Sequence, residues 1–137
     1  MIVALSLQGI VTLVNRKGCE ILGYDLIELL GTPWMDMVIP EDAREGTRKD
    51  FENSINGKTD FVPHQVSEVV TKSGERRLIE WHLTLIRDSD GVVTGTLSSG
   101  EDISVREIAA SEREQLQAQL RQSDKLKTIG TLAGGIA

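Results

Sequence analysis

Few side chains in this sequence could carry out metal or nucleophilic chemistry. The chain has one cysteine, Cys19, and two histidines, His64 and His82, both in strand-like sequence. One cysteine cannot form an internal disulfide, and zinc-type sites need three or four ligands, which two isolated histidines do not supply. The sequence therefore predicts no catalytic residue and no metal site, and it favours a reducing, cytoplasmic environment.

Asp102 and Ser104 have side chains suited to a different task, the capping of a helix. They stand where strand-rich sequence gives way to a long run of helix-forming residues. A carboxylate or hydroxyl there accepts backbone N–H bonds, and the carboxylate complements the positive end of the helix dipole. A movement of the preceding strand would tilt this cap, so we expect both residues to transfer a signal. Ordinary capping without signalling explains the same two residues.

Length and charge limit what the chain can be. Its 137 residues, 39% of them hydrophobic, suffice for one domain with an appendage. The formal charge of -6 comes from 21 acidic and 15 basic residues. It argues against nucleic-acid binding and against contact with anionic membranes, because both need clustered Lys and Arg. No apolar run approaches the roughly 18 residues of a membrane span.

The N-terminal half of the sequence predicts two strands followed by helices. Aliphatic runs over 2–7 and 10–14 flank Gln8-Gly9, which is typical of a β-hairpin. Asn15 can then cap the first of two short helices, which are broken by glycines. Residues 44–55 predict a polar helix with few apolar anchors, so we expect it to lie on the surface and to cover something.

From residue 62 onward the hydrophobic period changes to two. Turn signals at 72–75 and 88–91 separate three strand-like segments. In the middle one, Trp81 and Leu83 belong to an apolar face, and His82 belongs to the polar face. The order of two strands, several short helices and three strands predicts an α+β domain with an antiparallel sheet and helices on one side.

Seven short phrases along residues 2–104 together resemble a PAS domain. The resemblance implies a five-stranded sheet that encloses a small pocket with its helices, used for ligand sensing, for dimerisation or for both. It also implies that Glu101-Asp-Ile-Ser104 is the exit motif from which an output helix begins. The phrases are Gly9-Ile-Val-Thr-Leu-Val-Asn15, Ile21-Leu-Gly-Tyr24, Glu28-Leu-Leu-Gly31, Ile39-Pro-Glu-Asp42, Lys72-Ser-Gly-Glu75, Asp90-Gly91 and Glu101-Asp-Ile-Ser104.

The last residues resemble the start of the dimerisation and phosphoacceptor helix of sensor histidine kinases. In that helix a run like Leu132-Ala-Gly-Gly-Ile-Ala137 leads into the phosphorylated histidine, so we expect histidine to follow Ala137. Neither histidine of this chain can be that acceptor, and we expect the fragment itself to have no enzymatic activity. An ordinary amphipathic helix is the alternative. The apolar stripe on this segment comprises Leu126, Ile129, either Leu132 or Ala133, and Ile136.

Residues 105–123 predict a helix that connects these two parts. Ala109, Leu116, Leu120 and Ser123 fit a narrow coiled-coil seam, which Arg113 and Lys127 weaken. We predict a parallel coiled coil, with a single solvated helix as the alternative. The predicted organisation is a PAS sensory domain over 1–104, a helical linker over 105–123 and the start of the phosphoacceptor helix over 124–137.

The sequence offers candidates for a ligand pocket in the PAS-like domain. Apolar candidates are Trp34, Phe51, Trp81 and Leu83, and polar candidates are Asn15 and Ser99. A filled core is the alternative, since core packing alone places Trp81 on its apolar strand face. A small metabolite or a noncovalently bound flavin would suit such a pocket.

Two cofactors of related domains are disfavoured. By the resemblance, covalent flavin photochemistry requires a cysteine after the Gly31 position, where this chain has Thr32-Pro-Trp34. Haem in such domains generally takes a histidine from the long helix, and residues 44–55 contain none, so His64 or His82 would have to substitute.

These observations predict the signal-input module of a two-component sensor histidine kinase. We expect a homodimer through the PAS domain and the C-terminal helix, acting on downstream kinase domains and a response regulator. The alternatives are a ligand-free PAS module that only sets dimer geometry, and the input domain of a non-kinase regulator such as a cyclase or transcription regulator.

Overall fold

The computed structural model describes residues 1–57 and 62–136, with side chains described up to residue 125. The chain divides into two compact units, Met1–Ile103 and Ser104–Ala137. The boundary falls next to the predicted end of the sensory domain at residue 104. The first unit holds the sheet and the short helices, and the second is one helix.

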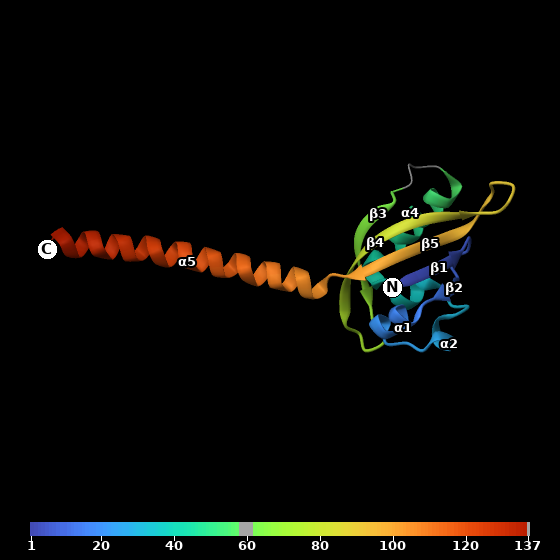
Figure 1. Ribbon diagram of the computed structural model, residues 1–137, viewed down its shortest axis with the longest axis horizontal. Helices are drawn as coiled ribbons and strands as arrows, with labels where there is room; N and C mark the ends of the chain where they lie inside the picture. The colour runs from blue at the N-terminus through green and yellow to red at the C-terminus, as the bar shows by residue number, and fades with distance from the viewer. Residues whose placement is uncertain (58–61, 137) are drawn as a thin grey trace. The chain divides into compact units, whose positions relative to one another are not determined.

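The first unit is built on a five-stranded antiparallel sheet with the order β2-β1-β5-β4-β3 (Figure 1). The central pair, β1 and β5, joins the two ends of this unit, and Ile2 to Ser6 pair with Ser99 to Gly95. The strands are β1 (Ile2–Ser6), β2 (Val11–Val14), β3 (His64–Val70), β4 (Arg76–Arg87) and β5 (Val93–Asp102). The predicted α+β fold class is confirmed.

The helices lie between β2 and β3 in the chain and cover one side of the sheet (Figure 1). They are α1 (Arg16–Leu22), α2 (Leu26–Leu29), α3 (Trp34–Val38), the 3-10 turn η1 (Glu41–Ala43) and α4 (Arg44–Asn56). The polar helix predicted over 44–55 is therefore α4. It has no buried residue along its length, which suits a helix at the surface.

Two glycines make the sharp turns that set the strand register. Gly9 between β1 and β2 has φ 76°, and Gly74 between β3 and β4 has φ 86°. A side chain would be strained at these values, whereas glycine adopts them freely. The turn at Gly74 brings β3 and β4 into register from His64 opposite His82 to Val70 opposite Arg76.

The hydrophobic core lies between the sheet and the short helices. The alternation of the strands turns Val3, Ile79 and Trp81 toward the helices, where they are buried. Leu22 of α1 and Leu29 of α2 are fully buried against this layer. Burial of such aliphatic side chains contributes about 1.5 to 3 kcal/mol each relative to exposure, so this layer is the main source of stability.

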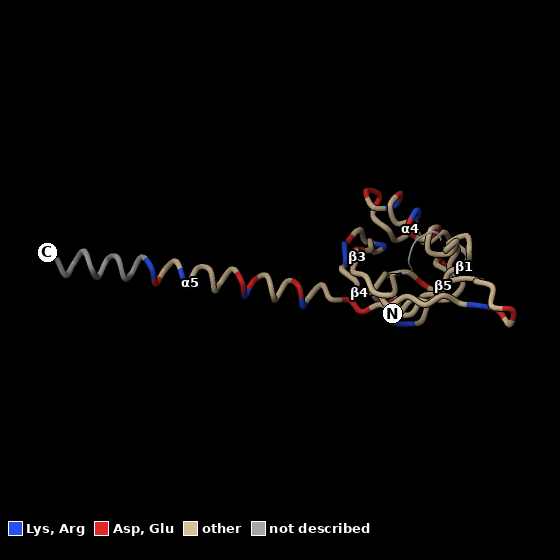
Figure 2. The backbone as a smooth tube through the Cα atoms, turned by 90° about the horizontal axis from the view of Figure 1, so that it is seen from above, with Lys and Arg blue, Asp and Glu red and all other residues tan. Residues whose placement is uncertain are grey.

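The second unit is α5 (Ser104–Ile136), a helix rich in charged residues of both signs (Figure 2). The side chains of residues 105–125 are exposed. The apolar stripe predicted on residues 126–136, and Lys127, lie outside the residues whose side chains are described. Among the described residues, no helix is long and apolar enough to cross a membrane.

Candidate ligand-binding site

A cavity of the first unit lies between the helix-covered face of the sheet and helices α3 and α4. Its volume is about 550 Å³, within the range of roughly 300 to 1,000 Å³ that is typical of small-molecule pockets. β1, β3, β4 and β5 form its wall on the sheet side, and Trp34 of α3 and Phe51 of α4 face them. The predicted surface helix α4 thus covers a cavity.

Two tryptophans meet edge to face at the wall of this cavity. The ring centroids of Trp34 and Trp81 lie 6.0 Å apart with an interplanar angle of 81°. This arrangement is favoured because the positive edge of one ring meets the negative face of the other. Both side chains are also largely buried, with 5% and 6% exposed, so they belong to the core and to the cavity wall together.

Gly100 of β5 makes the position of Trp81 possible. The two residues are directly opposite one another in the sheet. A Cβ atom on Gly100 would lie only 2.7 Å from the Trp81 ring and 2.7 Å from the Ile79 side chain. The indole therefore occupies the space that any larger residue at position 100 would need.

The polar groups of the cavity wall are hydroxyls, one amide and one carboxylate. Thr47 and Ser54 of α4, Thr96 and Ser98 of β5 and Gln65 of β3 are among them. The acidic residue is Asp50, which is exposed on α4. Among the described lining residues there is no Lys, Arg, His or Cys. The described part of the wall therefore offers hydrogen bonds and a negative charge, but no cationic side chain to pair with an anion.

The structure brings together four of the six residues predicted to form the pocket. Trp34, Phe51, Trp81 and Leu83 line the cavity. Whether they hold a ligand stays a prediction.

The other two, Asn15 and Ser99, lie elsewhere. Asn15 is the N-cap of α1: its Oδ1 accepts hydrogen bonds from Gly18 N and Ile2 N, both at 2.9 Å. Ser99 is exposed on β5, and its neighbour Ser98 lines the cavity in its place, because successive strand residues point to opposite faces. The parity of β5 was the signal that could have selected Thr96 and Ser98.

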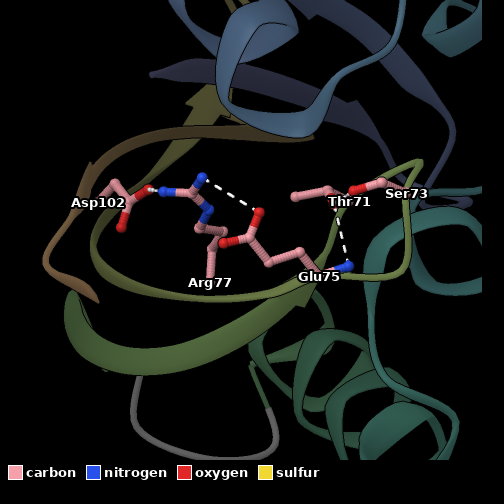
Figure 3. A network of polar contacts seen from close by, with 5 residues as sticks. All are labelled: Thr71, Ser73, Glu75, Arg77 and Asp102. Atoms are coloured by element: carbon pink, nitrogen blue, oxygen red, sulfur yellow. Dashed lines mark hydrogen bonds and ion pairs between the residues drawn. The ribbon is translucent and has the colours of Figure 1, made fainter. Parts of the chain in front are cut away.

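Asp102 is the last residue of β5 and takes part in a polar network with the turn between β3 and β4 (Figure 3). Arg77 of β4 donates from Nη1 to Oδ2 of Asp102 and from Nη2 to Oε2 of Glu75, both at 3.2 Å. Glu75 N in turn donates to Oγ1 of Thr71, which lies 3.0 Å from Oγ of Ser73. The network joins the end of β5 to the turn, and the capping role predicted for Asp102 and Ser104 stays a prediction.

The same turn is attached to the short helices. Lys72 donates its backbone N–H to Leu22 O at 2.9 Å and its ammonium to Glu28 Oε1 of α2 at 2.6 Å. The hydrogen bond and charge of Lys72 lower the pKa of the Glu28 carboxyl, and the bond to Glu28 raises the pKa of Lys72. The turn thus contacts α1 and α2 through Lys72, and it contacts Asp102 through Glu75 and Arg77.

The residues considered for cofactor chemistry lie outside the cavity. Cys19 is half-buried on α1, where burial above all, and then the charge of Asp25, raises the pKa of its thiol. A raised pKa keeps the thiol protonated and weakly nucleophilic. His64 and His82 lie on the opposite face of the sheet from the cavity, so neither reaches a ligand inside it.

An antiparallel sheet of this strand order, with short helices enclosing a cavity on one face, defines a PAS-type domain. Residues 11–99 match the family described as PAS fold. The chain belongs to this family.

The curated relatives are kinases. Sporulation kinase C of Bacillus subtilis (strain 168) is 30% identical over 131 residues, which are 95% of this chain and 30% of that protein. The signal transduction histidine-protein kinase AtoS of Escherichia coli (strain K12) is 25% identical over 138 residues, covering 99% of this chain and 20% of that protein. The chain thus spans less than a third of either relative, and it is a PAS sensory domain resembling those of sensor histidine kinases.

Solved structures show the same fold at lower identity. The PAS domain of a Colwellia psychrerythraea protein is 20% identical with a TM-score of 0.63, covering 75% of this chain and 85% of that one. The PAS domain of the Cronobacter turicensis RpfR quorum-sensing receptor, in complex with BDSF, is 19% identical with a TM-score of 0.62, covering 74% and 91%. These likenesses establish the fold alone.

Proposed function

We propose that this chain is the signal-input domain of a sensor histidine kinase and that it responds to a small ligand in its cavity. The observation that carries the proposal is the pairing of β4 with β5. Trp81 of β4, in the cavity wall, is packed on Gly100 of β5. Two residues further along, at the end of β5, Asp102 is opposite Ile79 of β4. A ligand that displaces Trp81 acts on β5 two residues before Asp102.

The proposed response then passes from β5 to α5. Asp102, which Arg77 holds, is the last residue of β5 before the helix. A shift of β5 therefore changes the direction in which the chain enters the helix. A ligand achieves this by binding one arrangement of the strands more tightly than the other.

The proposed ligand has an apolar body and a neutral or cationic polar group. Aromatic and aliphatic side chains supply most of the wall, which suits an apolar body. Hydroxyls at Thr96 and Ser98 can bond to a neutral group. An anionic ligand would meet the charge of Asp50 without a cationic partner in the described lining, at a cost in free energy.

We also propose that α5 pairs with the same helix of a second copy of the chain. Leu116 and Leu120 are 60% and 65% exposed. Their spacing of four residues fits two successive seam positions of a coiled coil, which would bury them. The chain is proposed to have no catalytic activity of its own, since phosphorylation would take place in the kinase domains of the whole protein.

A series of three probes with one apolar body tests the ligand class. Tryptamine, indole-3-acetamide and indole-3-acetate share an indole and differ in charge. In thermal unfolding, the amine and the amide should stabilise the chain more than the acetate does. Ser98→Phe, which fills the cavity, should remove the effect, and Ser99→Phe on the opposite face should not.

Two other outcomes would favour the alternatives. If no probe stabilises the chain and the native mass of the purified protein shows no bound molecule, a ligand-free dimerisation module is the better description. If the residue encoded after Ala137 is not histidine, the input domain of a non-kinase regulator is the better description.

A further inference from the structure

The two histidines of the chain, distant in the sequence, lie side by side on the sheet. His64 is the first residue of β3 and is directly opposite His82 of β4 in the antiparallel register. The imidazole centroids are 4.8 Å apart, with the ring planes at 44°. Both side chains are exposed on the face of the sheet that points away from the cavity.

A carboxylate completes this group. Glu80 is two residues before His82 on β4, so the alternation of the strand places it on the same face. Its Oε2 lies 3.8 Å from Nε2 of His64, and its side chain is only 27% exposed. One ligand atom from each of His64, Glu80 and His82 lies within 4.8 Å of the other two.

We propose that His64, Glu80 and His82 form a binding site for a divalent transition metal ion, with Zn²⁺ as the best match. Two imidazole nitrogens and one carboxylate oxygen are a ligand set that zinc accepts, with a fourth position left to water. Ligand atoms around a tetrahedral zinc ion lie about 3.4 Å apart, as follows from bonds of about 2.1 Å. The present separations reach up to 4.8 Å, so binding requires rotation of the three side chains toward one another.

The backbone makes the site favourable because it fixes two of the ligands in advance. Hydrogen bonds between β3 and β4 hold the Cα atoms of His64 and His82 in register, and Glu80 is on one of the same two strands. Binding therefore costs only the side-chain freedom of three residues. Mg²⁺ and Ca²⁺ prefer oxygen ligands, so a group with two imidazoles discriminates against them.

The site is separate from the proposed ligand cavity, because the two lie on opposite faces of the sheet. Zinc binding can therefore be tested without reference to the sensing of a small molecule. A purely structural cluster, in which the carboxylate and imidazoles only solvate one another, is the competing explanation. It predicts no specific uptake of zinc.

The decisive experiment is calorimetric titration of the chain with Zn²⁺, with Mg²⁺ in parallel. We expect one Zn²⁺ per chain and no Mg²⁺ binding. His64→Ala, His82→Ala and Glu80→Gln should each lower the zinc affinity at least about tenfold. Even the loss of a residue that only hydrogen-bonds to a metal ligand lowers metal affinity by about tenfold or more. Glu68→Gln removes an exposed carboxylate from β3 outside the group and should leave the affinity unchanged.

Spectroscopy can locate the metal directly, since the chain has only two histidines. In NMR, the imidazole nitrogen signals of both should shift together as one equivalent of Zn²⁺ is added. The titration is repeated on Cys19→Ser, because a single thiol also binds zinc. The proposal is overturned if zinc does not bind, if His82→Ala or Glu80→Gln binds it as tightly as the wild type, or if Cys19→Ser abolishes binding.

Discussion

Arg77 on β4 and Asp102 at the end of β5 form an ion pair, with Nη1 and Oδ2 3.2 Å apart. The side chains are 33% and 18% exposed, so the pair is partly shielded from water. The Nε atom of Arg77 is buried and has no hydrogen-bond partner in the described part of the chain. The hydrogen bonds from its two Nη atoms to the carboxylates of Asp102 and Glu75 therefore offset most of the free-energy cost of burying this guanidinium.

Replacing Asp102 with alanine should separate regulation from folding. The change removes a charged hydrogen bond in a partly exposed setting, so we expect a loss of about 1 to 2 kcal/mol in the free energy of unfolding, with the fold retained. In the full-length protein, autophosphorylation should become independent of the signal. Urea unfolding and an autophosphorylation assay measure the two effects.

Glu75→Ala is the matched control, because it removes the other carboxylate that contacts Arg77, within the turn and not at the exit of β5. It should leave the response to the signal in place. Regulation that persists in Asp102→Ala, or that is lost equally in both variants, would show that Asp102 has no special part in the relay.

Gly100→Ala should disturb the wall of the cavity through the core. Its Cβ would overlap the Trp81 ring and Ile79, so we expect a loss of about 1 to 3 kcal/mol in the free energy of unfolding, together with altered tryptophan fluorescence. Gly46→Ala, at a position of α4 with no atom within 4 Å of the new Cβ, should instead stabilise the protein by about 0.5 to 1 kcal/mol. Equal stabilities of wild type and Gly100→Ala would contradict the proposed packing.

The alternation of apolar and polar residues in the sequence predicted the strands and the apolar side of the cavity wall. On β4 the period of two identified the face that carries Trp81 and Leu83, because burial selects apolar residues at every second position. On β5 the same alternation places Ser98, and not the predicted Ser99, on the cavity face. Asn15 was misplaced because its side chain is used by two backbone N–H groups at the start of α1.

The histidine pair is a contact between residues that are far apart in the sequence. Sequence distance alone presents His64 and His82 as two isolated histidines. In the structure the register centres the turn on Ser73, from which His64 and His82 are equally far along the chain. The predicted turn at 72–75 is centred between Ser73 and Gly74, so it brings the two histidines within one residue of pairing but does not by itself fix the register. The contact between Arg77 and Asp102 could not be found in this way, since it depends on how β5 returns beside β4 after a separate turn.

The ion pair between Glu28 and Lys72 should make stability depend on pH in the acid range. The hydrogen bond from Lys72 above all lowers the pKa of Glu28 in the folded state. The pair therefore stabilises the protein fully above the unfolded pKa of about 4.3 and progressively less as pH falls through the lower folded value. Glu28→Gln should be less stable than wild type at neutral pH, and the two stabilities should converge as Glu28 becomes protonated.

Thermal unfolding between about pH 7 and pH 3 measures this convergence, because the other carboxyl groups titrate in both proteins. Lys72→Gln should behave like Glu28→Gln, since it removes the donor of the same hydrogen bond. A stability difference that stays constant over this range would mean that the pair does not lower the pKa of Glu28.

Leu116→Lys tests whether α5 pairs with a second copy of itself. Leu116 is 60% exposed, and in a coiled coil it would be buried opposite its equivalent, so a lysine there places two like charges at the seam. We expect the chain to sediment as a dimer and Leu116→Lys to raise the dimer dissociation constant at least about tenfold, the effect of 1.4 kcal/mol. Ala118→Lys adds the same charge at the outer f position of the heptad, away from the seam and its flanking positions, and should leave the dimer unchanged. If both variants sediment like the wild type, or if the wild type is a monomer at all concentrations, α5 is a solvated single helix in this chain and pairing through its leucines is excluded.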